Sequence, residues 1–228
     1  MRLWGRKNSI NVQKILWCLL ELGMQEGKDF ERIDAGLQFG INRTPEFLKL
    51  NPNGLVPVLE DGEIALWESN TIMRYLVRTH DKNQRFPQDV QSQYHSEKWM
   101  DWQLNAMWPG LRSAFLGLTR TPEAQRDYAL IRKQFQDTNL HFAVLDHVLG
   151  EQPYCSGTQF HIGDIVLALC VHRWILLNQT FPEQTGPRTP LENIDAWLKR
   201  IQAGTQFNQI ADTKLNICLL YTSDAADD

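Results

Sequence analysis

The chain has 228 residues, of which 43% are hydrophobic and 22% charged, and a formal net charge of −4. This length suits two small domains that share an interface, and the charge excludes the strongly basic surface of a typical nucleic-acid-binding protein. We expect a cytoplasmic protein, because the N-terminus lacks the apolar run of a signal peptide and no stretch is predicted to be long enough to span a membrane.

The first 80 residues alternate between strand and helix patterns. After a short apolar start, a helix is predicted that ends near Gly23 and repeats apolar residues at helical spacing, at Val12, Ile15, Leu16, Leu19 and Leu22. Residues 30–34 are predicted to form a second strand. Residues 44–50 are predicted to form a short helix, with Thr44 as its cap and a proline in its first turn.

Residues 51–76 read NPNGLVPVLEDGEIALWESNTIMRYL and carry the most information. Pro57 has no N–H, so it cannot be an ordinary residue of a central strand. Two short β-type runs, 58–60 and 64–67, flank a turn sequence and predict a hairpin. Beyond them the apolar residues recur at helical spacing, which predicts a helix that begins at or near Ser69.

The start of this last helix offers two ways to hold a charged ligand. Helix N-termini carry N–H groups without intrahelical partners and a positive partial charge, so they bind carboxylates. Glu68 supplies a carboxylate for an amine. A second interpretation is that Ser69 is an N-cap and Glu68 compensates the helix dipole. These residues alone leave both interpretations open.

A strand, a Val-Pro step, a hairpin and a Glu-Ser pair on a helix, in that order, resemble the glutathione-binding half of the glutathione S-transferases, especially bacterial members of the serine type. The resemblance implies a thioredoxin-like α/β domain at 1–80, a linker at 81–93 and an all-α domain at 94–217. It also implies a homodimer, and glutathione as a co-substrate with no covalently bound cofactor.

The same resemblance assigns glutathione-binding residues. It implies a cis peptide bond before Pro57, with Leu55, Val56 and Pro57 lying along glutathione. The Val56 backbone then faces outward and pairs with the cysteinyl unit. Glu68 and Ser69 hold the γ-glutamyl amine and carboxylate.

Catalysis in this family depends on converting the glutathione thiol into a thiolate. A free thiol has a pKa of about 8.5, so only a few per cent is ionised at pH 7. A hydroxyl that donates to the sulfur at the positive end of a helix favours the anion, and Ser9 has the matching place between the first strand and the first helix. Asn11 is expected to assist it. Either residue can instead be a helix cap.

Cysteine usage separates two chemistries on this fold. The four cysteines form no C-x-x-C motif, and none lies at the turn where a thioredoxin or glutaredoxin keeps its redox thiol. Cys18 and Cys170 are predicted to fill the core. A conjugating transferase is therefore expected rather than a thiol reductase.

From Tyr94 onward the pattern is helical nearly throughout. One predicted helical segment is rich in aromatic residues, and the others cover 128–149, 162–177 and 191–203, with 162–177 as the buried central helix. Relatives carry a hydroxyl residue three positions before an aspartate at the start of that helix. Here Asp164 is present and His161 replaces the hydroxyl residue, which affects the strength of the cap and not the fold.

A small hydrophobic electrophile is expected to bind between the two domains. Trp108, Arg112 and Phe115 share one helical face and are candidates to line that cleft, although the aromatic residues can equally be domain core. The six histidines show no metal-ligand spacing, so no metal is expected.

The last eleven residues, CLLYTSDAADD at 218–228, have no helical stripe and resemble a translated sequencing adapter. Without Asp224, Asp227 and Asp228 the 27 acidic residues become 24 against 23 basic ones, and the net charge becomes −1. The native sequence is expected to differ after about Ile217. The acidic residues of the tail therefore give no information about acidic partners.

The expected function is attack of glutathione thiolate on an electrophilic carbon. Three alternatives remain on the same fold. One is a glutathione-dependent peroxidase, disulfide reductase or isomerase. Another is a non-catalytic interaction module, and the third is a thiol oxidoreductase, which the missing cysteine disfavours.

Overall fold

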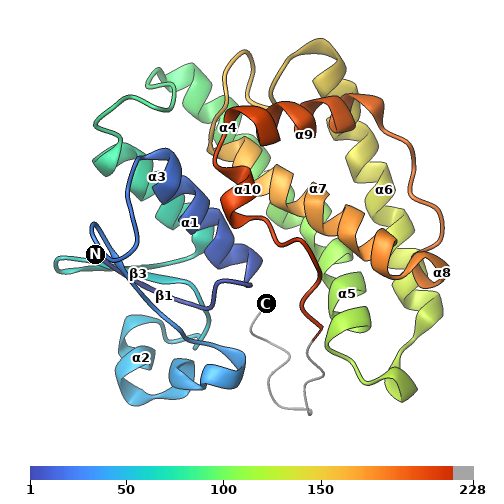
Figure 1. Ribbon diagram of the computed structural model, residues 1–228, viewed down its shortest axis with the longest axis horizontal. Coiled ribbons are helices and arrows are strands. Elements are labelled where there is room, and N and C mark those ends of the chain that lie inside the picture. Colours follow the sequence, from blue (N-terminus) through green and yellow to red (C-terminus); the bar gives the residue numbers. More distant parts are fainter. Residues whose placement is uncertain (218–228) are drawn as a thin grey trace. The chain divides into compact units, whose positions relative to one another are not determined.

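The computed structural model describes residues 1–217, so the predicted adapter-derived tail and Cys218 lie outside the described residues. The described chain divides into two compact units (Figure 1): Met1–Arg85 form the first, and the second begins at Phe86. The boundary falls within the predicted linker 81–93. Helix α4 begins at Val90, so the last part of that linker is helical.

The first unit has the predicted order of strands and helices. Its elements are β1 Arg2–Trp4, α1 Ile10–Glu21, β2 Glu31–Ile33, two 3-10 turns Leu37–Phe39 and Ile41–Arg43, α2 Pro45–Leu50, β3 Val58–Asp61, β4 Ile64–Trp67 and α3 Ser69–His80. The strands form one mixed sheet in the order β2-β1-β3-β4. β1 is parallel to β2 and antiparallel to β3, and β4 is antiparallel to β3. This arrangement confirms the predicted thioredoxin-like domain.

Helices cover both faces of this sheet. In the first unit, α1 and α3 pack side by side on one face, and α2 lies against the other (Figure 1). Thr44 caps α2 as predicted, because its hydroxyl accepts a hydrogen bond from the Phe47 N–H at 3.3 Å. Phe47 in turn meets the Trp4 ring edge-to-face at 5.9 Å between centroids. The cap thus holds α2 where its one buried side chain reaches the sheet.

The second unit is helical, as predicted. Its elements are α4 Val90–Trp102, a π-helical turn Gln103–Met107, α5 Trp108–Thr119, a 3-10 turn Glu123–Gln125, α6 Tyr128–Glu151, α7 Ile162–Thr180, α8 Pro182–Thr185, α9 Glu192–Gly204 and α10 Phe207–Ile210. The aromatic-rich segment was predicted as one helix, but the π turn interrupts it. Pro109 is the second residue of α5 and has no N–H for a regular helical hydrogen bond, so a local change of pitch accommodates it.

Helix α7 is the core of this unit. Trp174 is fully buried on it, donates to Asn139 Oδ1 at 3.0 Å and packs against the Phe142 ring at 4.4 Å. By length and composition α7 could cross a membrane, so the expectation that no stretch is long enough was wrong. However, 72% of its most apolar window is buried inside the protein, as in the core helix of a folded domain.

The start of α7 is capped from two elements. Asp164 Oδ2 accepts from the His161 N–H at 3.0 Å, and His161 Nδ1 accepts from the Ile162 N–H at 2.8 Å. The next N–H, that of Gly163, donates to the hydroxyl of Ser96 on α4 at 2.7 Å. A hydroxyl is therefore present at this helix start, but a neighbouring helix supplies it. A Cβ at Gly163 would lie 2.7 Å from the Ser96 carbonyl oxygen, so glycine permits this approach.

Candidate functional site

The loop before β3 is held by asparagine side chains. Asn51 Nδ2 donates to the Leu55 carbonyl at 2.8 Å, and Asn51 Oδ1 accepts from the Asn53 N–H at 3.0 Å. Asn42 Nδ2 donates to the carbonyl of Gly54, a residue with φ of 67°. These bonds fix the backbone that leads into Val56.

The peptide bond between Val56 and Pro57 is cis, as predicted. Both side chains are buried, whereas Leu55 is half-buried. The hairpin ladder begins at Val58, two residues beyond Val56. The Val56 backbone, which is predicted to pair with a peptide ligand, therefore lies just before the first residue of β3.

Glu68 has an unusual backbone at the start of α3. It is the N-cap residue, its φ is 70°, and its side chain makes no capping hydrogen bond. Ser69 is the first helical residue, so the alternative that Ser69 is the N-cap was wrong. Positive φ is costly for a residue with a Cβ, and such backbone strain concentrates at functional sites. The strained backbone of Glu68 thus marks this end of α3 as a candidate functional site.

The Ser69 side chain joins α3 to α1. Its hydroxyl donates to Asn11 Oδ1 at 3.3 Å and accepts from Lys14 Nζ at 3.5 Å. Lys14 also lies 3.5 Å from Asn70 Oδ1 and is only 1% exposed. Lys14 was not predicted as a site residue from the sequence. The signal available was a lysine inside the apolar run from Val12 to Leu19.

Ser9 stands at the N-cap position of α1. Its carbonyl accepts hydrogen bonds from the N–H groups of Val12 and Gln13, but its side chain makes no capping bond. Within residues 1–217 the Ser9 hydroxyl is fully buried and has no hydrogen-bond partner. Leaving such a group unsatisfied costs about 1–3 kcal/mol, so a structural role alone does not account for it. A hydroxyl at the positive end of a helix is suited to donate to an anion.

Asn11 lies in the first turn of α1 and is half-buried. Its carbonyl oxygen is occupied by Ser69. The first unit therefore brings together Ser9, Asn11 and Ser69, all predicted from the sequence, at the N-terminal ends of α1 and α3. Their roles toward a ligand stay predictions.

Two of the candidate residues for the hydrophobic substrate are buried in the second unit. Phe115 is 2% exposed and lies between two guanidinium groups, that of Arg173 at 4.3 Å from its ring centroid and that of Arg120 at 5.1 Å. Trp108 is 8% exposed, and Arg112 is half-buried. These contacts give Phe115 a packing role within its own helical unit.

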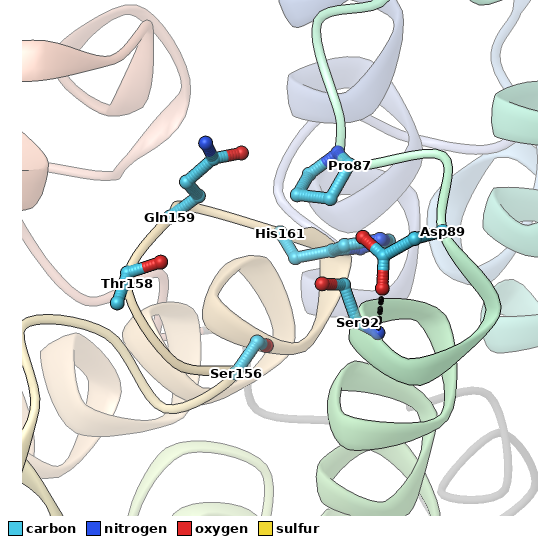
Figure 2. Close-up of a pocket in the computed structure, with 7 residues that line it drawn as sticks. All are labelled: Pro87, Asp89, Ser92, Ser156, Thr158, Gln159 and His161. Atoms are coloured by element: carbon cyan, nitrogen blue, oxygen red, sulfur yellow. Dashed lines mark hydrogen bonds between the residues drawn. The ribbon is translucent and has the colours of Figure 1, made fainter.

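A polar pocket of about 200 Å³ opens in the second unit, where the start of α4 meets the loop before α7. Figure 2 shows Asp89 and His161 pointing into it, with hydroxyls of Ser92, Ser156 and Thr158 around them. The dashed line marks the N-cap bond from the Ser92 N–H to Asp89, at 2.8 Å. The side chains of Asp89 and His161 serve as helix caps here. The helix starts of the first unit are therefore a better candidate for the functional site than this pocket.

Residues 1–217 contain no group of three or more His, Cys, Asp or Glu side chains placed to hold a metal ion. Cys18, Cys155 and Cys170 are buried, and desolvation raises the pKa of Cys18 and Cys155 well above the usual range of a thiol. Such thiols are poorly reactive, because the thiolate is the nucleophile.

The sequence is similar to known glutathione S-transferases over most of its length. The sequence model of the family described as "Glutathione S-transferase, N-terminal domain" matches residues 1–78. Glutathione S-transferase GstB of Escherichia coli is 37% identical over 201 residues, which cover 87% of this chain and 91% of that protein. Glutathione S-transferase D6 of Drosophila melanogaster is 26% identical over 90% of this chain and 88% of its own length.

A solved structure is similar over nearly the whole length. It is the theta class glutathione S-transferase from Xanthomonas axonopodis pv. citri with glutathione bound. Its sequence is 37% identical, the TM-score is 0.82, and the match covers 94% of this chain and 98% of that one. The likeness therefore includes both units.

Proposed function

The chain belongs to the glutathione S-transferase family, and from that premise we propose that its first unit binds glutathione and activates the thiol at Ser9. The tripeptide lies along Leu55, Val56 and Pro57, with its cysteinyl unit paired to the Val56 backbone. The γ-glutamyl amine meets Glu68, and the γ-glutamyl carboxylate meets Ser69. The cis bond before Pro57, the asparagine-held loop and the strained backbone of Glu68 support this placement.

The buried hydroxyl of Ser9 is the observation that carries the proposal. It lies at the positive end of α1 and has no hydrogen-bond partner within residues 1–217. A thiolate accepts a hydrogen bond from it, which lowers the pKa of the glutathione thiol and increases the ionised fraction at neutral pH. Asn11 supports this arrangement through its bond with Ser69.

The reaction is conjugation of glutathione to a small hydrophobic electrophile. The thiol proton leaves to solvent, and the thiolate sulfur forms a bond to an electrophilic carbon. A halide or similar group then departs with the electron pair of the broken bond. On an activated double bond the neighbouring carbon instead takes up a proton. We further propose a cytoplasmic homodimer in which Trp108, Arg112 and Phe115 contribute to electrophile binding.

The test is a panel of substrates assayed with glutathione on the purified protein. We expect conjugation of an aryl halide or an activated alkene to exceed reduction of an organic peroxide or a glutathione disulfide. Higher activity on peroxides or disulfides would move the function to a glutathione-dependent reductase. Absence of glutathione binding by calorimetry would instead favour a non-catalytic interaction module. Light scattering tests the dimer, since a monomeric mass contradicts it.

A further inference from the structure

We propose that Lys14 is a glutathione-binding residue whose ammonium group pairs with the α-carboxylate of the γ-glutamyl unit. The inference rests on the proposed function, because it adds a charged residue to the glutathione site of the first unit. Lys14 is on α1, whereas Glu68 and Ser69 are at the start of α3.

The position of the ammonium group carries the proposal. Lys14 Nζ lies 3.5 Å from Ser69 Oγ and 3.5 Å from Asn70 Oδ1, the side chains of the first two residues of α3. It therefore sits where the free N–H groups of that helix begin. The helix end contributes a partial positive charge, and Lys14 adds a full one at the same place.

Burial makes this charge effective. The Lys14 side chain is 1% exposed, and Ser69 and Asn70 are 6% and 3% exposed. Charge pairs in such a place are screened far less than pairs on the surface. Lysine is rarely buried so completely. A buried ammonium group loses its hydration, which costs free energy that an aliphatic side chain at the same position would not lose. A charge kept at this cost is more valuable for binding than for packing.

The chemistry of the γ-glutamyl end explains why a cation is useful. That end carries an ammonium and a carboxylate on the same carbon. If Glu68 binds the ammonium, its negative charge repels the neighbouring carboxylate of the ligand. The positive charge of Lys14, beside Ser69, offsets this repulsion. Glu68 and Lys14 then supply one charge of each sign for a zwitterion.

A purely structural role is the competing explanation, because Lys14 also links α1 to α3. The two roles differ in their dependence on the ligand. A residue that binds the α-carboxylate loses its effect when the ligand lacks that group. A residue that only holds the helices in place affects every ligand of the site equally.

The experiment compares two variants and two ligands by calorimetry. The ligands are glutathione and γ-aminobutyryl-cysteinyl-glycine, the analogue without the α-carboxylate. Lys14→Met should weaken glutathione binding by about 10- to 100-fold, as for loss of a buried ion pair, and change binding of the analogue by less than about 3-fold. Lys7→Met is the matched control, since Lys7 is largely exposed and pairs with Glu26. It should leave both affinities unchanged.

Two results would overturn the inference: an equal loss for both ligands, or no loss for either. If Lys14→Met does not fold, Lys14→Arg keeps the charge and Lys14→Gln removes it at similar length. Glutathione binding that is retained by the arginine variant and lost by the glutamine variant supports the ion pair, and equal binding by both contradicts it. If the unaltered protein binds no glutathione, the proposed function fails, and the inference fails with it.

Discussion

The Ser69 hydroxyl donates a hydrogen bond to Asn11 Oδ1 over 3.3 Å and so joins the first turn of α3 to the first turn of α1. The proposed γ-glutamyl position at Ser69 is therefore in contact with a residue only two positions from Ser9, where the sulfur is proposed to bind. The carbonyl oxygen of the Asn11 side chain is engaged in this bond, and the predicted role of Asn11 is to assist Ser9.

Replacing Ser9 with alanine tests thiol activation. Loss of a hydrogen bond to a charged group costs about 1.5–3 kcal/mol, so Ser9→Ala should lower turnover at neutral pH by about 10- to 100-fold. The pKa of the bound thiol should rise, as read from the pH dependence of kcat, while glutathione affinity stays within a few-fold. Unchanged turnover would assign thiol activation to Asn11, and Asn11→Ala is the variant to compare.

Replacing Ser69 with alanine tests the γ-glutamyl position. Ser69→Ala should weaken glutathione binding by about 10-fold or more, because the hydroxyl is proposed to bond a carboxylate. Thr79→Ala is a suitable control, since Thr79 is on the same helix, is exposed, and donates its hydroxyl hydrogen bond to the Tyr75 carbonyl of that helix. Calorimetry measures both. Equal affinity in the two variants would leave Ser69 with a purely structural role.

Glu68 should show opposite effects on stability and binding. Its φ of 70° is a conformation that glycine adopts without a Cβ penalty. Glu68→Gly should therefore raise the free energy of unfolding by up to about 1 kcal/mol while weakening glutathione binding, because the carboxylate is lost. Denaturant unfolding and calorimetry give the two numbers. A variant that gains stability and keeps full affinity would remove Glu68 from the binding site.

Asp164 gives a pH-dependent test of the second unit. Burial raises the pKa of this carboxyl from 3.8 to about 6, although three N–H groups, those of Cys155, His161 and the Trp197 indole, donate to it. The folded state thus favours the protonated form relative to the unfolded chain. Its contribution to stability is full below pH 3.8 and is lost as the pH rises through about 6.

The matched variant is Asp164→Asn, which has no titration. The stability of the unaltered protein relative to this variant should fall by up to about 3 kcal/mol as the pH rises between those two values and then stay constant. Denaturant unfolding of both proteins across this range measures it. A relative stability that increases with pH would place the pKa of Asp164 below its ordinary value.

Local patterns were sufficient for most of the fold. The apolar spacing in α1, α6 and α9 and the continuous apolar run of α7 predicted helices close to the observed bounds, because both patterns are properties of the segment itself. The Thr44 cap and the hairpin turn at Gly62 are likewise properties of a few adjacent residues. The break in the aromatic-rich helix was not predicted, since its cause is the single Pro109.

The residues of the candidate site form two groups: those that the sequence indicated, and those that only the tertiary structure brought together. The positions of Ser9 and Glu68 next to helix starts were predicted from local patterns, because the start of a helix depends on neighbouring residues. The cis bond before Pro57 and the ligand roles of these residues came from the resemblance to a known family and not from a local pattern. Only the tertiary structure decided that Lys14 lies beside Ser69, and that Ser96 supplies a hydroxyl to the start of α7. These partners are 55 and 67 positions apart in the chain. Their contacts arise from helices packing together, and no periodic or local pattern specifies which side chains then meet.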